Sequence, residues 1–281
     1  MTAARSRVRR WEDYSLDGTG GGVLRNLREI TDADELSRFE TYAAQVRMMQ
    51  LAVDPVVGSF DYSHMKEVHR RIFQDVYEWA GQTRIGPPSP KKMSKSALDV
   101  SRGPGSPPGP GERAYFYFPG DYLEENIAVE YARLSDAKLF VGVELDIFIA
   151  ELAERWAEIN VLHAFREGNT RSQFVFFHQL SANAGFTLDP NKFKAVTELR
   201  DEFVYARFYA HVKDASWLRS VLEMAITPLD DGRQQPLLDS DPRSPGGILR
   251  LGDVGATTVR GRFASHRRPE SQTGLGRDLG Q

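Results

Sequence analysis

The sequence of 281 residues contains no cysteine. Disulfides, thiolate catalysis and cysteine-based zinc sites are therefore excluded, and we expect a cytoplasmic protein. No run is long and apolar enough to span a bilayer, and the basic N-terminus lacks the apolar segment of a secretory signal. The net charge of -3 supplies no global field that would attract nucleic acid. We therefore expect neither a membrane nor a nucleic-acid partner.

Proline and glycine are concentrated in two regions, and this concentration predicts the domain organisation. Residues 1–20 are expected to form a basic arm, and residues 21–228 one folded domain. Within that domain, residues 83–120 are too rich in proline and glycine for a long helix, and we expect a short β-hairpin joined by a flexible excursion. Residues 229–281 have few large apolar side chains, so we expect a disordered tail.

Apolar residues recur at helical spacing through most of the remaining chain. The clearest stripe lies within residues 63–82, where Gly81 is expected to cap the helix. Asp214 is expected to N-cap the last helix. The fold class is therefore all-α, with a small β-hairpin. The predicted helices span 32–53, 63–81, 122–137, 144–161, 171–184, 191–212 and 215–225.

One segment, NVLHAFREGNTRSQFVFF at residues 160–177, carries groups with distinct chemistry. A turn at Gly168 and Asn169 precedes a helix, and free backbone N–H groups at a helix start bind anions such as phosphate. Glu167 would repel phosphate unless a divalent cation such as Mg²⁺ bridged them. Arg171 can bind phosphate oxygens, and His163 can accept a proton near neutral pH. These groups together predict a hydroxyl attacking a Mg²⁺-bound polyphosphate.

The stretch HAFREGNTR, residues 163–171, resembles the signature of the Fic (filamentation-induced-by-cAMP) domain family. The flanking stretches HRRIFQDVYEWAGQTR, YFYFPGDYLEENI and FVYARFYAHVKDASWLRSVLEMAI are similar to this family as well. The resemblance covers residues 14–227. It implies an α-helical Fic fold with a β-hairpin flap, and a bacterial protein adenylyltransferase that transfers AMP from ATP to a protein hydroxyl. The flap would correspond to residues around 83–87 and 115–118.

The resemblance also implies roles for individual residues. His163 would be the general base, Phe165 would pack beneath the loop, and Glu167 would hold Mg²⁺. The phosphates of ATP would be bound by the next four residues, with the Asn side chain at the α-phosphate and the Arg at the distal phosphates: Gly168, Asn169, Thr170 and Arg171.

Two positions depart from the signature. Thr170 stands in place of the second glycine, and because threonine is ordinary at a helix start, we expect the loop to survive. Phe174 stands in place of the final arginine, which in the family binds the γ-phosphate and pairs with an inhibitory glutamate. This departure leaves the nucleotide preference and the usual autoinhibition open. The inhibitory motif has a weak match at residues 31–36, and a separate antitoxin is as plausible as self-inhibition.

Three functions stay open from the sequence. The first is adenylyl transfer to a Ser, Thr or Tyr hydroxyl, by a toxin or by an effector secreted into host cells. The second is phosphotransfer of the death-on-curing type, against which Gly168 argues. The third is a degenerate module that binds a nucleotide or a partner without catalysis. The histidines outside the motif, His64, His69 and His178 among them, show no spacing typical of zinc ligands and are interpreted as bystanders.

Overall fold

The computed structural model describes residues 8–96, 114–194, 197–209 and 214–229. These residues form seven α-helices and two short antiparallel strand pairs, which confirms the predicted all-α class with a small flap hairpin. The helices are α1 Ala33–Val53, α2 Tyr62–Phe73, α3 Leu123–Asp136, α4 Leu145–Leu162, α5 Asn169–Asn183, α6 Glu198–Tyr209 and α7 Ser216–Glu223.

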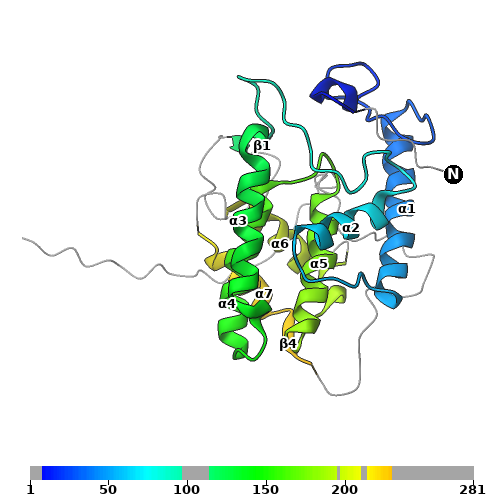
Figure 1. The fold of residues 1–281 in the computed structure, drawn as a ribbon. Coiled ribbons are helices and arrows are strands. Elements are labelled where there is room, and N and C mark those ends of the chain that lie inside the picture. Colours follow the sequence, from blue (N-terminus) through cyan, green and yellow to red (C-terminus); the bar gives the residue numbers. More distant parts are fainter. Residues whose placement is uncertain (1–7, 97–113, 195–196, 210–213, 230–281) are drawn as a thin grey trace, which may run out of the picture.

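Helix α5 lies at the centre of the molecule (Figure 1). Helix α2 packs on one side of α5 and α4 on the other, with α1 outside α2 and α3 outside α4. Because α5 is covered on several sides, the whole run from Asn169 to Phe177 is buried. This burial explains the apolar sequence of residues 174–177, and it leaves the polar residues 169–173 buried where the start of α5 meets several helices.

The flap hairpin pairs β1 Ser94–Ser96 with β2 Ala114–Phe116. A second pair, β3 Phe186–Leu188 with β4 Ile226–Pro228, was not predicted. It joins the end of α5 to the chain after α7. Each of its strands is three residues long, which is too short for an alternating pattern to be recognised in the sequence.

Asp32 caps α1 by accepting a hydrogen bond from the Glu35 N–H at 2.8 Å, which agrees with the predicted start of this helix. The observed helix limits differ from the predicted ones in three places. Helix α2 ends at Phe73, earlier than expected, and the chain continues in turns to Gly81, which adopts a left-handed φ of 81°. The predicted helix at 191–212 begins at Glu198, after the 3₁₀ turn Pro190–Phe193. Ala215, and not Asp214, is the N-cap of α7, although the Asp214 carboxylate accepts from the Ser216 N–H at 3.0 Å.

Part of the segment expected to be an N-terminal arm packs on the helical core. The 3₁₀ helix η1 Trp11–Tyr14 brings in Tyr14, which is 2% exposed and contacts Trp79 edge to face. The Arg166 guanidinium lies over the Trp11 ring. Residues 1–7, the middle of the flap region at 97–113 and the predicted tail at 230–281 lie outside the described residues.

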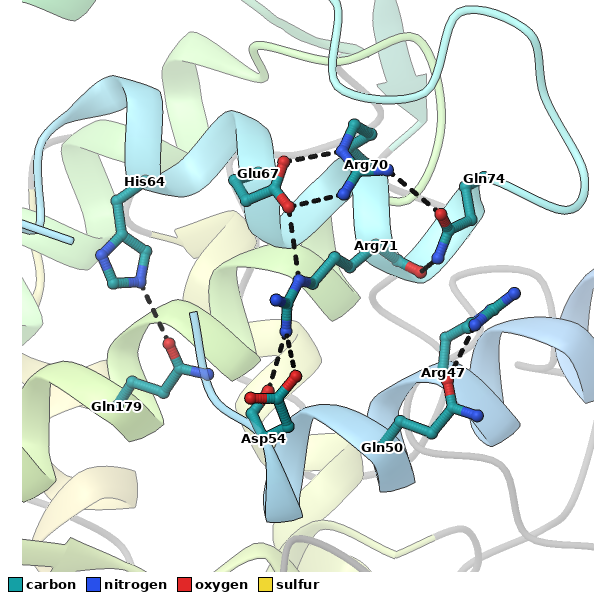
Figure 2. Close-up of polar contacts among 9 residues, drawn as sticks. All are labelled: Arg47, Gln50, Asp54, His64, Glu67, Arg70, Arg71, Gln74 and Gln179. Carbon is teal, nitrogen blue, oxygen red and sulfur yellow. Dashed lines mark hydrogen bonds and ion pairs between the residues drawn. The ribbon is translucent and has the colours of Figure 1, made fainter. Parts of the chain in front are cut away.

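Ion pairs join helix α1 to helix α2 (Figure 2). Arg71 on α2 binds Glu67 on its own helix and Asp54 at the end of α1. Such partly exposed pairs contribute about 1 kcal/mol or less each, so they adjust the packing of α1 and do not determine it. A helix with the length and hydropathy needed to cross a membrane does not occur among the described residues.

Candidate active site

His163 forms the end of α4 and has a left-handed backbone, with φ 48° and ψ 59°. Non-glycine residues adopt this conformation rarely, and usually where surrounding contacts enforce it. Here Arg84 donates from Nε to the His163 carbonyl at 2.6 Å, and the Tyr117 ring stacks on the imidazole with centroids 3.7 Å apart. The imidazole is therefore held in one orientation, with the side chain 8% exposed.

The loop between α4 and α5 is closed by Asn169. Its side-chain oxygen accepts from the Phe165 N–H at 2.9 Å, and its amide nitrogen donates to the Phe165 carbonyl at 2.7 Å. Asn169 is also the first residue of α5, so the N–H groups of the first helical turn have no acceptor within the helix. The loop is thus closed by side-chain hydrogen bonds and leads into a helix N-terminus whose donors could bind an anion, so the anion site stays a prediction.

The two loop positions next to Asn169 differ in what they require. Gly168 has a φ of 79°, and a Cβ there would lie 2.2 Å from the Phe73 ring, so no larger residue fits. Thr170 lies inside α5 and is not among the left-handed positions of the described chain. The expectation that the loop tolerates threonine is therefore confirmed.

Arg171 points toward α1 and pairs with a carboxylate that the sequence analysis missed. Its guanidinium binds the Glu40 carboxylate and lies 3.6 Å from Glu167 Oε1 and over the Phe73 ring. The Tyr77 hydroxyl donates to the same Glu40 side chain. Burial acts to lower the pKa of Arg171, but the two carboxylates outweigh it and raise that pKa. The guanidinium is therefore protonated and already partnered at its inner side.

The weak inhibitory match at residues 31–36 does not supply this partner. Its glutamate, Glu35, is exposed in the first turn of α1, whereas Glu40 lies more than one turn further along and reaches Arg171. Nothing in the local sequence distinguishes Glu40, because the contact joins residues 131 positions apart.

Glu167 lies at the mouth of the loop, with 43% of its side-chain surface exposed. The dense surroundings and the negative charge of Glu40 raise the pKa of Glu167, and Arg171 acts against them. Solvent limits this shift at the exposed surface. In the part of the chain that the structure describes, no group of three acidic or histidine side chains could hold a metal ion. A single exposed carboxylate suits Mg²⁺, which commonly takes one or two protein carboxylates and completes its sphere with substrate oxygens and water.

His69, interpreted from the sequence as a bystander, has a structural role: it supports the loop from α2. The ring is fully buried; Nδ1 accepts from the Gly81 N–H at 2.7 Å, so Nε2 carries the proton and donates to the Glu167 carbonyl at 3.0 Å. Burial lowers the pKa of His69 to about 3, which keeps the ring neutral. Its place on the buried stripe of α2 was the signal that could have identified it.

Arg84 ties the flap segment to the histidine loop. It is 3% exposed and donates to three carbonyls: those of Phe118, Leu162 and His163. The last two belong to the C-terminal end of α4, where the helix dipole favours a cation. Because one side chain binds both segments, the position of His163 is coupled to that of the flap.

The sequence and the structure of the chain match known proteins. The model of the Fic/DOC family matches residues 59–181. A probable protein adenylyltransferase, y4lH of Sinorhizobium fredii, is 36% identical over 174 residues, which are 62% of this chain and 78% of that protein. The protein adenylyltransferase VbhT of Bartonella schoenbuchensis is 27% identical over 76% of this chain and 39% of its own length.

Solved structures show the same fold. The N-terminal Fic domain of a Bartonella quintana protein, solved with bound ADP, has a TM-score of 0.61 at 21% identity and covers 77% of this chain and 95% of that one. The Fic domain of the Bep8 protein from Bartonella has a TM-score of 0.58 at 25% identity, covering 73% of this chain and 91% of its own. The match over the motif and the coverage of y4lH lead to one conclusion: this chain belongs to the Fic/DOC family.

Proposed function

We propose that this chain is a protein adenylyltransferase that transfers AMP from Mg²⁺-ATP to a Ser, Thr or Tyr hydroxyl of another protein. The observation that carries the proposal is the convergence of His163, Glu167 and the free N–H groups of α5 on one rigid loop. The similarity to a relative described as a probable protein adenylyltransferase supports the same reaction.

In the proposed reaction, the His163 imidazole takes the proton of the target hydroxyl. The hydroxyl oxygen then bonds to the α-phosphorus, the bond from that phosphorus to the bridging oxygen breaks, and pyrophosphate leaves. The N–H groups of Asn169, Thr170 and Arg171 are proposed to bind the phosphate oxygens, with the loop shape set by Gly168. The bound Mg²⁺ would neutralise developing charge on the phosphates, and the Glu167 carboxylate is the residue that would hold it.

Two side chains keep more specific proposed roles. The Asn169 amide closes the loop through Phe165, so any contact with the α-phosphate adds to this role and does not replace it. Arg171 is proposed to reach the distal phosphates with the N–H groups that Glu40 leaves available. A separate antitoxin remains a proposed partner.

The test is a labelling assay in bacterial lysate with Mg²⁺ and ATP that carries the label at either the α- or the γ-phosphate. We expect a protein band labelled by α-ATP alone, lost in His163→Ala and in EDTA. The matched control is His178→Ala, which removes a histidine outside the site and should retain labelling. A band labelled by γ-ATP alone would establish phosphotransfer instead. ATP binding without any labelled band would support the degenerate module.

A further inference from the structure

A second arginine reaches the start of α5 from the opposite side. Arg207 on α6 is 3% exposed. Its NH1 donates to Thr170 Oγ at 3.0 Å, and its NH2 donates to Asn160 Oδ1 and, at 3.4 Å, to Gln173 Oε1. Three helices therefore hold one guanidinium in a fixed position beside the first turn of α5.

All of these partners are neutral. Among the residues that the structure describes, no carboxylate pairs with Arg207, and its buried Nε has no acceptor. Arg171 binds Glu40, and Arg200 on the same helix α6 binds Asp201 at 3.2 Å, so Arg207 differs from both. Burial lowers the pKa of Arg207 to about 10, and it is still protonated at neutral pH.

A buried cation without a counter-ion is unfavourable, because its water has been replaced by dipoles that cannot neutralise it. Neutral oxygens orient the guanidinium but leave its positive charge in place. An anion that bound here would supply the missing charge. The arrangement is therefore that of a preformed anion site more than that of a stabilising ion pair.

Arg207 lies next to the loop between α4 and α5. Thr170 belongs to the first turn of α5, whose N–H groups are available to an anion, and its hydroxyl contacts Arg207 directly. Tyr117, which stacks on His163, is close enough for electrostatic coupling: burial raises the pKa of Tyr117, and the charge of Arg207 acts against this rise. Arg207 is thus linked to the helix start through Thr170 and to the imidazole through Tyr117.

The aromatic residues next to Arg207 account for the departure at position 174. Phe174 is fully buried against Trp156 and Phe203. The Arg207 guanidinium lies over the Phe203 ring, 5.2 Å from its centroid. Position 174 therefore contributes apolar packing, and the cation on this side of α5 comes from α6.

We propose that Arg207 binds a phosphate group of the nucleotide, as the second cation of the site beside the first turn of α5. This inference rests on the proposed function, because it takes the ligand to be a polyphosphate bound at that turn. It assigns substrate binding to a residue outside the signature. Arg171, paired with Glu40, is then not the sole arginine at the phosphates.

The experiment measures binding of ATP, inorganic tripolyphosphate and adenosine, each with Mg²⁺, by calorimetry. The variants are Arg207→Gln, Arg207→Lys and the control Arg200→Gln, which alters another buried arginine of α6. We expect Arg207→Gln to weaken ATP and tripolyphosphate binding by at least about tenfold and to leave adenosine binding unchanged. Arg207→Lys should lose less, and Arg200→Gln should bind all three ligands as the wild type does.

The pattern across ligands distinguishes phosphate contact from a structural role. If Arg207 only joins the helices, its variants will lower the unfolding temperature and weaken adenosine and ATP equally, which overturns the inference. If Arg207→Gln does not fold, the binding data for Arg207→Lys decide. The inference is overturned if Arg207→Lys loses the same affinity for adenosine as for tripolyphosphate, or loses affinity for neither. A wild type that binds ATP and labels a protein, with Arg207 variants that bind equally well, refutes this inference alone. A wild type that binds no polyphosphate refutes the proposed function with it.

Discussion

Two left-handed residues, His163 and Gly168, bracket the short segment proposed to carry the chemistry, and their conformations have different origins. Gly168 needs its conformation because the loop must turn and because the Phe73 ring occupies the space of a Cβ. His163 adopts the same region without being glycine, at a cost of about 1–3 kcal/mol that the Arg84 and Tyr117 contacts offset. The backbone on either side of the motif is thus held by contacts made with other elements.

At Gly168 we expect the substitution Gly168→Ala to lower the free energy of unfolding by about 3 kcal/mol and to abolish labelling. The reason is a positive φ combined with a clash at 2.2 Å from Phe73. Gly142→Ala is the matched control, since Gly142 has a φ of 80° and a Cβ added there would have no neighbour within 4 Å. It should cost about 1 kcal/mol, and urea unfolding would measure both. Equal losses would mean that the Phe73 contact is not restrictive.

The burial of His178 predicts that the stability of the protein depends on pH. Burial lowers its pKa to about 4, with Asp189 opposing, so the unfolded chain binds the proton more readily. Stability is then complete above the unfolded pKa of about 6.5, and it falls by about 3 kcal/mol as the pH decreases toward 4. Urea unfolding between pH 4 and 7 should show a smaller decrease for His178→Gln than for the wild type. Parallel curves would contradict this prediction.

Among the elements, those with a periodic sequence were predictable and those defined by distant contacts were not. The amphipathic stripes gave α1, α3, α4 and α5 to within about two residues. The β3–β4 pair and the early end of α2 depend on contacts between segments far apart in the chain, which no local pattern encodes.

The residues of the candidate site likewise fall into a group that the sequence could identify and a group that it could not. His163, Glu167 and the loop residues are contiguous, so the sequence could bring them together. Glu40, Tyr117 and Arg207 belong to α1, the flap and α6, and their contacts with the loop depend on how those elements pack.

Glu40 on α1 binds Arg171 on α5, and removing this ion pair tests how much it contributes to the packing of the two helices. Glu40→Gln leaves buried Arg171 without its main carboxylate, and we expect the free energy of unfolding to fall by about 2–4 kcal/mol. Glu223→Gln breaks the exposed pair with Arg219 and should cost less than about 0.5 kcal/mol. Chemical denaturation of both variants provides the comparison. A loss at Glu40 no larger than that at Glu223 would show that the Arg171 pair does not hold α1 in place.

For the whole molecule, the boundary of the folded domain follows from where the last described residues are buried. Strand β4 closes the domain: Ala225 and Ile226 are each 3% exposed, and the Leu229 N–H donates to the Gly185 carbonyl at 2.9 Å. The composition after residue 229 predicts no contribution to the core. The domain should therefore end at β4, close to the predicted boundary at 228.

Truncation after Leu229 tests this boundary. We expect residues 1–229 to unfold within about 2 °C of the full chain and to label the same target. A chain that ends at Met224 loses Ala225, Ile226 and the pairing with β3, and burial of the isoleucine alone is worth about 1.5–3 kcal/mol. Its unfolding temperature should fall by roughly 5 °C or more. A large loss already in the 1–229 chain would show that the segment after β4 packs on the domain, and the boundary would then lie further along the sequence.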